Sequence, residues 1–188
     1  DVYGFTMAPV SAEIWRGAAG KVALQPVPAS ALATRPAALH RMDLATMAPR
    51  DQDFTAEVVM AAQEPASAEG GGAAVAPAAV SCVVLWFDVE FSARFCAQRP
   101  VVLSTSPAAE QTHWVQAVLP LKAPLELPAG GALAARVSMA RSPARHRALD
   151  VSLEYGVLAA GAGSGAGEGL GAALREAVSF CMEIGGKD

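Results

Sequence analysis

The sequence predicts a mainly β fold, an antiparallel barrel or sandwich, and three observations support this prediction. Runs rich in β-branched and aromatic residues recur at intervals of about ten residues. Glycine and proline separate these runs at positions where turns are expected. The alternation of strands and helices that builds a parallel sheet is missing from the pattern. The predicted strands are residues 39–47, 54–60, 80–91, 101–104, 114–119, 132–140 and 149–155.

The first 36 residues do not follow this strand pattern. Tyr3, Phe5 and Met7 alternate with smaller residues, and glycine and proline interrupt residues 13–36 so often that no period persists. We expect an extended segment with about one helical turn. Its exposed aromatic residues indicate that it docks against another surface.

The strand predictions differ in their support. Residues 40–47 alternate polar and apolar side chains, as a half-buried strand does. Residues 80–91 form the strongest candidate, because they are β-branched and aromatic and contain neither glycine nor proline. Residues 149–155 alternate almost without exception. Residues 63–79 are rich in Ala, Gly, Pro and Ser, and we interpret them as a flexible loop.

The C-terminal residues have a different composition. Residues 161–167 contain only Gly, Ala and Ser and favour a flexible linker over a phosphate-binding loop, because the glycine spacing and strand–helix context are wrong. Residues 170–178 could form a short helix. Residues 180–184 are either a closing strand or simply the end of the chain.

Composition excludes several classes of function. The 188 residues carry a formal net charge of −4, which disfavours a nucleic-acid partner. The three cysteines, an odd number without a CxxC pair, predict free buried thiols in a reducing compartment. No apolar run is long enough to predict a membrane span, and no histidine spacing predicts a metal site. The chain does not start with Met, so we expect a piece of a longer protein.

The candidate site is a polar loop between two apolar strands, where His113 and Trp114 are adjacent. Functional residues concentrate on loops of this kind, yet spacing alone favours a core tryptophan beside a hydrogen-bonded histidine. Asp88 and Glu90 share one strand face and could form an acid–base pair, although a solvated face is favoured. The remaining histidines, His40 and His146, are expected to face solvent.

Three segments resemble the C-terminal half of protein arginine methyltransferases. Leu103-Ser-Thr-Ser-Pro107 precedes Thr112-His-Trp-Val-Gln116, as a Ser-Thr-x-Pro segment precedes a Thr-His-Trp loop in that family. Val2-Tyr-Gly-Phe-x-Met7 is similar to the start of the family's dimerisation arm, and Asp88-Val-Glu-Phe91 is similar to one of its strands. The resemblance covers roughly residues 1–155 and is closest to the type I enzymes, which dimethylate asymmetrically.

The resemblance implies a β-barrel into which a short helical or extended arm is inserted. Residues 1–36 would be the dimerisation arm, residues 37–156 the substrate-binding barrel, and residues 157–188 a flexible tail, with a closing strand as one alternative for its end. The family transfers a methyl group from S-adenosylmethionine to arginine guanidinium groups of proteins. Its cofactor domain and its paired glutamates would lie upstream of this chain. We therefore expect no cofactor and no metal in the chain itself, and no activity from it alone.

The resemblance also assigns roles to individual residues. His113 and Trp114 would be catalytic-site residues, with Thr112 and Trp114 contacting the substrate. His113 would pair with the methyltransferase domain, and Trp114 would wall the channel for the target arginine. Tyr3, Phe5 and Met7 would belong to the dimer arm.

Partners and location follow from the same resemblance. Expected partners are arginine–glycine-rich or histone-like protein substrates and a second copy of the full-length enzyme, without direct binding to nucleic acid or membranes, in the cytoplasm, the nucleus or both. The sequence departs from the family at Val115, where lysine is usual, and in the long loop at residues 63–79. The alternative hypothesis is a non-catalytic β-barrel that serves as a protein-interaction module.

Overall fold

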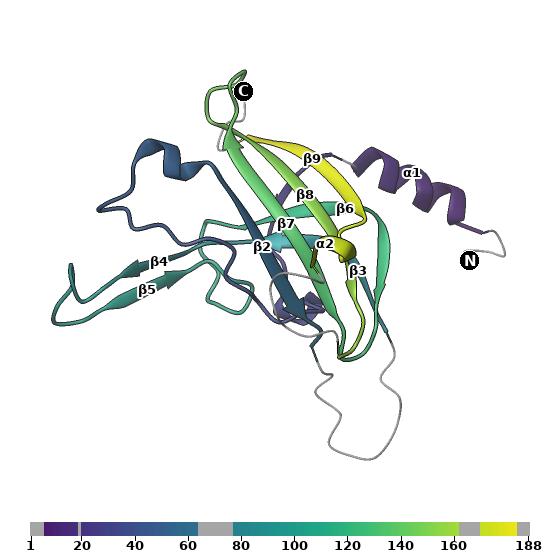
Figure 1. Cartoon of the computed structure of the whole chain (residues 1–188), viewed down its shortest axis with the longest axis horizontal. Coiled ribbons are helices and arrows are strands. Elements are labelled where there is room, and N and C mark those ends of the chain that lie inside the picture. The colour runs from purple at the N-terminus through teal and green to yellow at the C-terminus, as the bar shows by residue number, and fades with distance from the viewer. Residues whose placement is uncertain (1–5, 19, 64–76, 162–169, 184–188) are drawn as a thin grey trace, which may run out of the picture.

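The computed structural model describes residues 6–18, 20–63, 77–161 and 170–183, whose strands form antiparallel sheets (Figure 1). One sheet has four strands in the order β2 (Phe54–Ala61), β7 (Ala132–Arg141), β8 (Ala148–Leu158), β9 (Glu176–Glu183). A second has the order β1 (Ala23–Gln25), β6 (Gln116–Leu127), β3 (Ala78–Leu85). Strands β4 (Asp88–Phe91) and β5 (Val101–Ser104) pair only with each other. The helical elements are α1 (Ala8–Ala18), η1 (Ala29–Ala31), η2 (Pro49–Gln52) and α2 (Leu170–Ala173).

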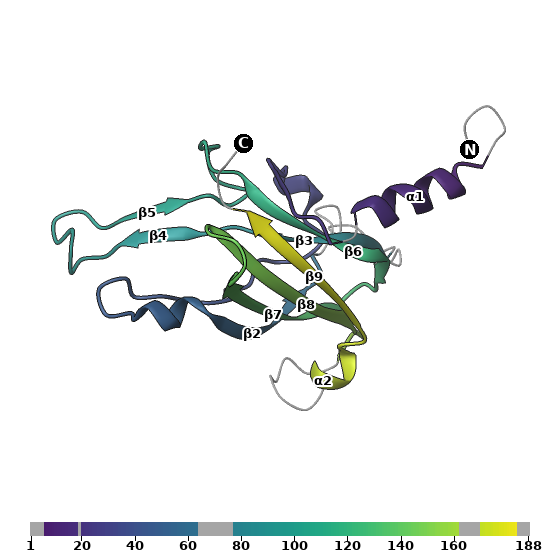
Figure 2. The ribbon, with the colours of Figure 1, turned by 90° about the horizontal axis from the view of Figure 1, so that it is seen from above.

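The core lies between the four-stranded and the three-stranded sheet, which pack face to face (Figure 2). Alternate residues of β8 point inward, so Val151, Leu153 and Tyr155 are buried while the residues between them are more exposed. Leu119 and Leu121 of β6 meet them from the opposite sheet. Burying a side chain of this size contributes about 1.5–3 kcal/mol, so this interface dominates the stability of the fold.

A polar contact joins the two sheets across this core. The hydroxyl of Tyr155, a residue only 1% exposed, accepts a hydrogen bond from the backbone N–H of Lys122 at 2.9 Å. Lys122 lies in β6, so a side chain of one sheet replaces a missing ladder partner in the other.

Strand β6 carries two prolines, and their positions explain how the three-stranded sheet tolerates them. Strand β1 pairs only with residues 116–118 of β6, so Pro120 and Pro124 lie beyond its end. On the other side, the register with β3 shifts between Val80 and Cys82, opposite Pro120. Proline cannot donate to a ladder, and a bulge is where a sheet accepts it.

Helix α2 covers one end of the outer face of the four-stranded sheet. Leu170 and Ala173 are buried against Ala134 of β7. A Cβ atom added to Gly156 of β8 would lie 1.7 Å from the carbonyl oxygen of Ala173, so only glycine allows this approach. The backbone N–H of Arg175 then donates to the carbonyl of Tyr155 at 3.1 Å, which leads the chain into β9.

The mainly β, antiparallel prediction is confirmed, although the ladders among the described residues form separate sheets and not one closed barrel. Predicted strands at residues 54–60, 101–104, 132–140 and 149–155 correspond to β2, β5, β7 and β8. A strand, β9, ends the described chain and pairs with β8 along its length. The division into arm, barrel and tail remains a prediction.

The strand predicted at residues 39–47 is wrong. Asp43 accepts the N–H of Ala45 with its side chain and those of Thr46 and Met47 with its carbonyl, which makes a turn. The strand predicted at residues 80–91 is interrupted at Trp86 and Phe87, because the chain changes partner there. Residues up to Leu85 pair with β6, and residues from Asp88 pair with β5.

Two helix predictions also differ from the structure. Helix α1 has eleven residues, where about one turn was expected, because it is rich in alanine and its proline, Pro9, lies in the first turn, where proline is tolerated. The predicted helix at residues 170–178 stops at Ala173, since β8 offers residues 176–183 a strand partner. The predictions for Tyr3, Phe5, most of the loop at residues 63–79 and most of the linker at residues 161–167 lie outside the described residues.

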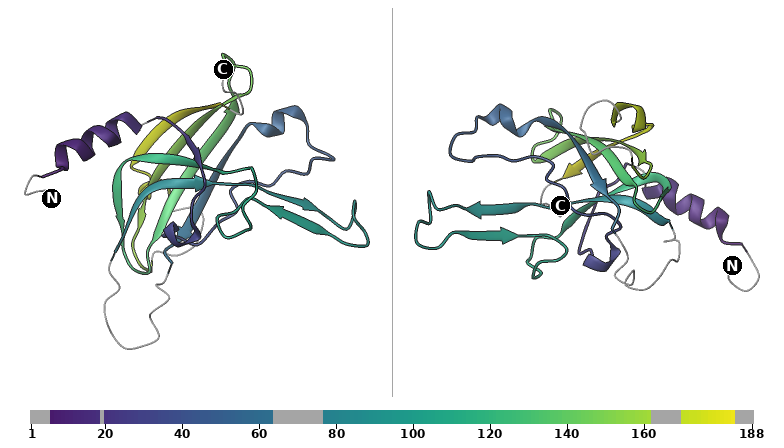
Figure 3. Two further views of the ribbon diagram at one scale, coloured as in Figure 1. Left: turned by 180° about the vertical axis from the view of Figure 1, so that it is seen from behind. Right: turned by 60° about the horizontal axis from the view of Figure 1, so that its bottom comes forward.

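Helix α1 and the β4–β5 hairpin project from opposite ends of the molecule (Figure 3). No helix within the described ranges is long and apolar enough to cross a membrane.

Candidate functional site

The loop that carries His113 and Trp114 connects β5 to β6 and is closed by its own hydrogen bonds. The hydroxyl of Thr112 accepts the backbone N–H of Trp114 at 3.1 Å and donates to the carbonyl of Trp114 at 3.2 Å. Threonine often makes such bonds two residues along the chain, where they stabilise turns. Thr112 therefore shapes the backbone on which both rings are mounted.

The rings of His113 and Trp114 lie together at the surface. Their centroids are 3.9 Å apart with the planes tilted by 37°. The Trp114 ring also meets Phe87 edge-to-face at 5.9 Å and 75°. Trp114 is 44% exposed, so the prediction of a core tryptophan, which spacing alone favoured, is wrong. One part of the indole is held by aromatic neighbours and the rest faces solvent.

Beneath this surface lies a buried polar network that the sequence did not predict. Thr105, which is 2% exposed, donates its hydroxyl to the carbonyl of Phe87 at 2.8 Å and accepts the N–H of Phe87 at 3.2 Å. Gln116, which is 7% exposed, donates to the carbonyl of Thr105 at 2.7 Å. The side chain of Gln116 accepts the N–H of Val27 at 2.8 Å. Thr105 and Gln116 are the two buried polar residues in the part of the chain that the structure describes.

The predicted pair of acidic residues on β4 does not form an acid–base pair. Asp88 accepts the hydroxyl of Ser104 at 2.6 Å across the hairpin, and Ser104 in turn accepts the N–H of Ser106 at 3.2 Å. Asp88 and Glu90 are both exposed, in agreement with the favoured solvated face. Asp88 thus orients the start of the site loop.

The β4–β5 hairpin presents an apolar face next to the site. The register pairs Val89 with Leu103 and Phe91 with Val101, and alternate residues of a strand share a face. We call these four residues the hairpin face. Phe91 and Val101 are exposed. Phe87, two residues before Val89, bonds to Thr105 and touches Trp114, so the hairpin face runs on into the candidate site.

The other predicted residues lie elsewhere. His40 stacks on Phe54 at 4.1 Å, and His146 is exposed in the turn between β7 and β8. Met7 is exposed before helix α1, while Tyr3 and Phe5 lie outside the described residues. All three cysteines are free, as predicted, but the prediction that they are buried is wrong: Cys82 and Cys96 are half-buried and Cys181 is exposed. Partial burial raises the pKa of the Cys82 thiol. Within the described ranges, no three His, Cys, Asp or Glu side chains gather in a way that could hold a metal ion.

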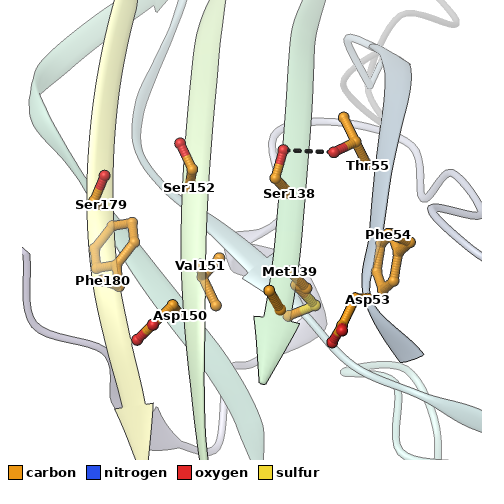
Figure 4. A pocket seen from close by; sticks show the side chains of 11 residues that line it. Asp53, Phe54, Thr55, Ser138, Met139, Asp150, Val151, Ser152, Ser179 and Phe180 are labelled. Atoms are coloured by element: carbon orange, nitrogen blue, oxygen red, sulfur yellow. Dashed lines mark hydrogen bonds between the residues drawn. The ribbon is translucent and has the colours of Figure 1, made fainter. Parts of the chain in front are cut away.

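A groove of about 610 Å³ crosses the four-stranded sheet away from Trp114. Figure 4 shows a hydroxyl side chain on each strand in a row: Thr55, Ser138, Ser152 and Ser179. Thr55 and Ser138 are hydrogen-bonded at 2.8 Å. This row could not be found from sequence, because it depends on the register of four strands.

Asp53, one of the residues that line this groove, forms an ion pair with Arg141. Asp53 binds the side chain of Arg141 at 3.2 Å and its backbone N–H at 2.9 Å. The hydrogen bonds and the charge of Arg141 lower the pKa of the Asp53 carboxyl below its ordinary value.

Comparison with known proteins identifies relatives over most of the chain. Residues 1–159 match the family model of the arginine methyltransferase oligomerization subdomain. The chain is 35% identical over 173 residues to the probable protein arginine N-methyltransferase 3 of Arabidopsis thaliana, covering 82% of this chain and 27% of that protein. It is 26% identical over 155 residues to protein arginine N-methyltransferase 1 of Schizosaccharomyces pombe, covering 82% of this chain and 40% of that protein. The chain thus spans less than half the length of these relatives.

Two solved structures share the fold. One is the Trypanosoma brucei PRMT1 enzyme–prozyme heterotetrameric complex with AdoHcy, with a TM-score of 0.69 and 24% identity, covering 97% of this chain and 49% of that one. The other is the open conformation of Arabidopsis thaliana protein arginine methyltransferase 10, with a TM-score of 0.70, 19% identity and the same two coverages. At these identities the likeness concerns the fold alone.

Proposed function

The chain belongs to the arginine methyltransferase oligomerization subdomain family, and from this premise we propose that its parent protein methylates arginine in protein substrates. The methyl donor would be S-adenosylmethionine and the acceptor a guanidinium nitrogen. Family membership supports the reaction class, and the exposed ring of Trp114 supports the location of the site.

Trp114 is suited to form one wall of a channel for an arginine side chain. A guanidinium is planar, carries a delocalised charge and stacks favourably on an aromatic face. Phe87 and His113 hold the indole from two directions while leaving much of it open. A ring that is fixed before the substrate arrives loses little entropy on binding.

His113 and Thr112 would support this wall. The hydroxyl of Thr112 holds the loop backbone, so its role is to shape the loop. The imidazole of His113 is exposed beside the indole and could pair with a polar group of the methyltransferase domain. We propose that this pair holds the two domains in register.

The cofactor would bind outside this chain. A ligand of this size needs a cleft that buries most of its surface. The groove on the four-stranded sheet is an open row of hydroxyls, and the Trp114 loop lies at the surface. We propose that S-adenosylmethionine binds in the methyltransferase domain of the parent protein.

Helix α1 would contact a second subunit. Val10 and Ile14 are exposed on a helix in which no residue is buried. Exposed apolar residues that gather on one element indicate a contact surface. We propose an assembly of two parent proteins in which α1 reaches the partner. The cytoplasm, the nucleus or both remain the proposed location.

A methyl-transfer assay tests this function. The parent protein is incubated with labelled S-adenosylmethionine and an arginine–glycine-rich peptide, and with a matched peptide in which lysine replaces every arginine. We expect label in methylarginine from the first peptide alone, and none from the 188-residue chain by itself. A parent protein that labels neither peptide would instead support the non-catalytic interaction module.

A further inference from the structure

The side chain of Gln116 occupies a position where both of its polar ends are needed. It is the first residue of β6 and lies two positions after Trp114. Its Nε2 donates to the carbonyl of Thr105, and its Oε1 accepts the N–H of Val27. The opposite orientation of the amide would place N–H against N–H and oxygen against oxygen, so only one orientation fits. A buried amide without these partners would cost free energy.

From Gln116 the network reaches Trp114 through space as well as along the chain. Thr105 receives the Gln116 bond and makes three bonds to the backbone of Phe87, one of them from its own N–H to the Phe87 carbonyl at 3.1 Å. The ring of Phe87 then meets the indole edge-to-face. Moving Gln116 would therefore disturb two connections to Trp114: the contact of its indole with Phe87, and the backbone of the loop that ends at Gln116.

On its other side, Gln116 is joined to the segment that follows helix α1. Strand β1 pairs with the start of β6, with Gln25 opposite Gln116 and Leu24 opposite Ala117. Two residues later, Val27 donates its N–H to the Gln116 side chain. The residues after α1 thus join β6 at the point where the Trp114 loop ends.

We propose that Gln116 is a positioning residue that couples the place of the α1–β1 segment to the orientation of Trp114. When the segment shifts, the N–H of Val27 leaves Gln116, and the bond from Gln116 to Thr105 loses its alignment. Docking of α1 on a partner would then change the orientation of Trp114 in the proposed arginine channel. This last consequence rests on the proposed function, whereas the coupling itself can be measured without methyl transfer.

A purely structural role for Gln116 makes a different prediction. If the amide only satisfies two buried backbone groups, its replacement lowers the free energy of unfolding and leaves the folded Trp114 where it is. If Gln116 positions the loop, the environment of Trp114 changes in the folded protein. A probe of the indole separates the two roles.

The experiment labels the 188-residue chain with 5-fluorotryptophan and records its fluorine NMR spectrum. The resonances of Trp15, Trp86 and Trp114 are assigned with single Trp→Phe variants. Gln116→Met keeps the side-chain volume and removes both hydrogen bonds. Val27→Pro removes only the donor, at a position where Pro28 already favours extended backbone. Gln111→Met is the matched control, because Gln111 is exposed in the same loop.

We expect Gln116→Met and Val27→Pro to move the Trp114 resonance toward its position in the urea-denatured chain and to broaden it. The Trp15 resonance should stay in place in Gln116→Met. The double variant should shift Trp114 no further than Gln116→Met does, since both act on one network. If Gln116→Met fails to fold, the Trp114 resonance of Val27→Pro alone decides whether Gln116 positions Trp114.

The proposal is overturned if the Trp114 resonance of the folded variants coincides with that of the wild type and only the unfolding midpoint falls. It is also overturned if Gln111→Met shifts the resonance equally. A parent protein that transfers no methyl group would refute the proposed function, and the fluorine spectra would still decide the role of Gln116.

Discussion

At the scale of single residues, the ion pair between Asp53 and Arg141 makes stability depend on pH. Arg141 lowers the pKa of Asp53 in the folded chain below 3.8, its ordinary value. A carboxyl with a lowered folded pKa stabilises the fold above the unfolded pKa, and this stabilisation is lost as the pH falls through the folded pKa. Both side chains are largely exposed, so solvent screens the effect.

We therefore predict that Asp53→Asn lowers the melting temperature at neutral pH and that the difference from the wild type shrinks as the pH falls below 3.8, the ordinary pKa, and through the lower pKa of the folded chain. Calorimetric melts across this pH range measure the difference. In an Arg141→Gln background the same substitution should matter less. A difference that stays constant down to acidic pH would show that the charge of Asp53 contributes nothing.

The hydrogen bond of the Tyr155 hydroxyl gives a second prediction, which concerns the stability of the fold. Tyr155→Phe leaves the ring in the core and removes the acceptor for the N–H of Lys122. Losing this part-buried hydrogen bond should cost about 0.5–1.5 kcal/mol, which urea unfolding measures. Thr55→Val, at an exposed hydroxyl of the outer sheet face, should change stability by less than about 0.5 kcal/mol. Equal effects of the two substitutions would refute the role of the Tyr155 bond.

At the scale of elements, the strands that pair on both sides were predictable and the segments that change partner were not. Strand β8 alternates over most of its length because one of its faces is buried. The break at Trp86 and Phe87 has no local signal, because it depends on where β6 begins. The apparent strand at residues 40–47 alternates by composition, yet the turn at Asp43 prevents pairing.

The docking of α2 on the sheet gives a prediction at this scale. Gly156→Ala would place a Cβ atom within 1.7 Å of the carbonyl of Ala173, so α2 must leave the sheet. We expect a loss of at least about 2 kcal/mol and faster hydrogen exchange of α2, while β7 and β8 remain protected. Gly171→Ala, with no atom within 4 Å of the added Cβ, should be neutral or stabilising by up to about 1 kcal/mol.

The candidate site was predictable to a similar extent. The loop of Thr112, His113 and Trp114 could be found by its motif and by its place between strands. Phe87, Thr105 and Gln116 could not be found, because each acts through a backbone or ring contact to a residue distant in sequence. The sequence therefore reveals the side chains that would meet a substrate, whereas the network that holds them requires the strand register.

At the scale of the whole molecule, exposed apolar residues lie on the two elements that project from it and on the site loop. Val10 and Ile14 lie on α1, Phe91 and Val101 on the β4–β5 hairpin, and Trp114 on the loop that follows β5. Helix α1 and the hairpin project from opposite ends of the molecule (Figure 3). Surfaces of this kind are covered in a complete assembly. We propose that helix α1 meets a second parent protein, and that the β4–β5 hairpin and the Trp114 loop meet the methyltransferase domain.

If α1 of one copy docks on the proposed methyltransferase domain of the other, the 188-residue chain alone should be monomeric at micromolar concentration. Light scattering should give a mass near 19.2 kDa. A tight dimer that Ile14→Glu dissociates would show that α1 binds this chain itself and would contradict the proposal.

We propose that Trp114 is a wall of the arginine channel and not a structural core residue. The most direct measurement is the kcat/KM for methylation of an arginine–glycine-rich peptide by the parent protein carrying Trp114→Ala, together with its unfolding free energy. We predict a loss of about 100-fold or more in kcat/KM and a loss of stability below about 1.5 kcal/mol, against about 2–5 kcal/mol for Leu119→Ala in the core. An unfolded variant, or a folded one with wild-type kcat/KM, would show that Trp114 is not a wall of the channel.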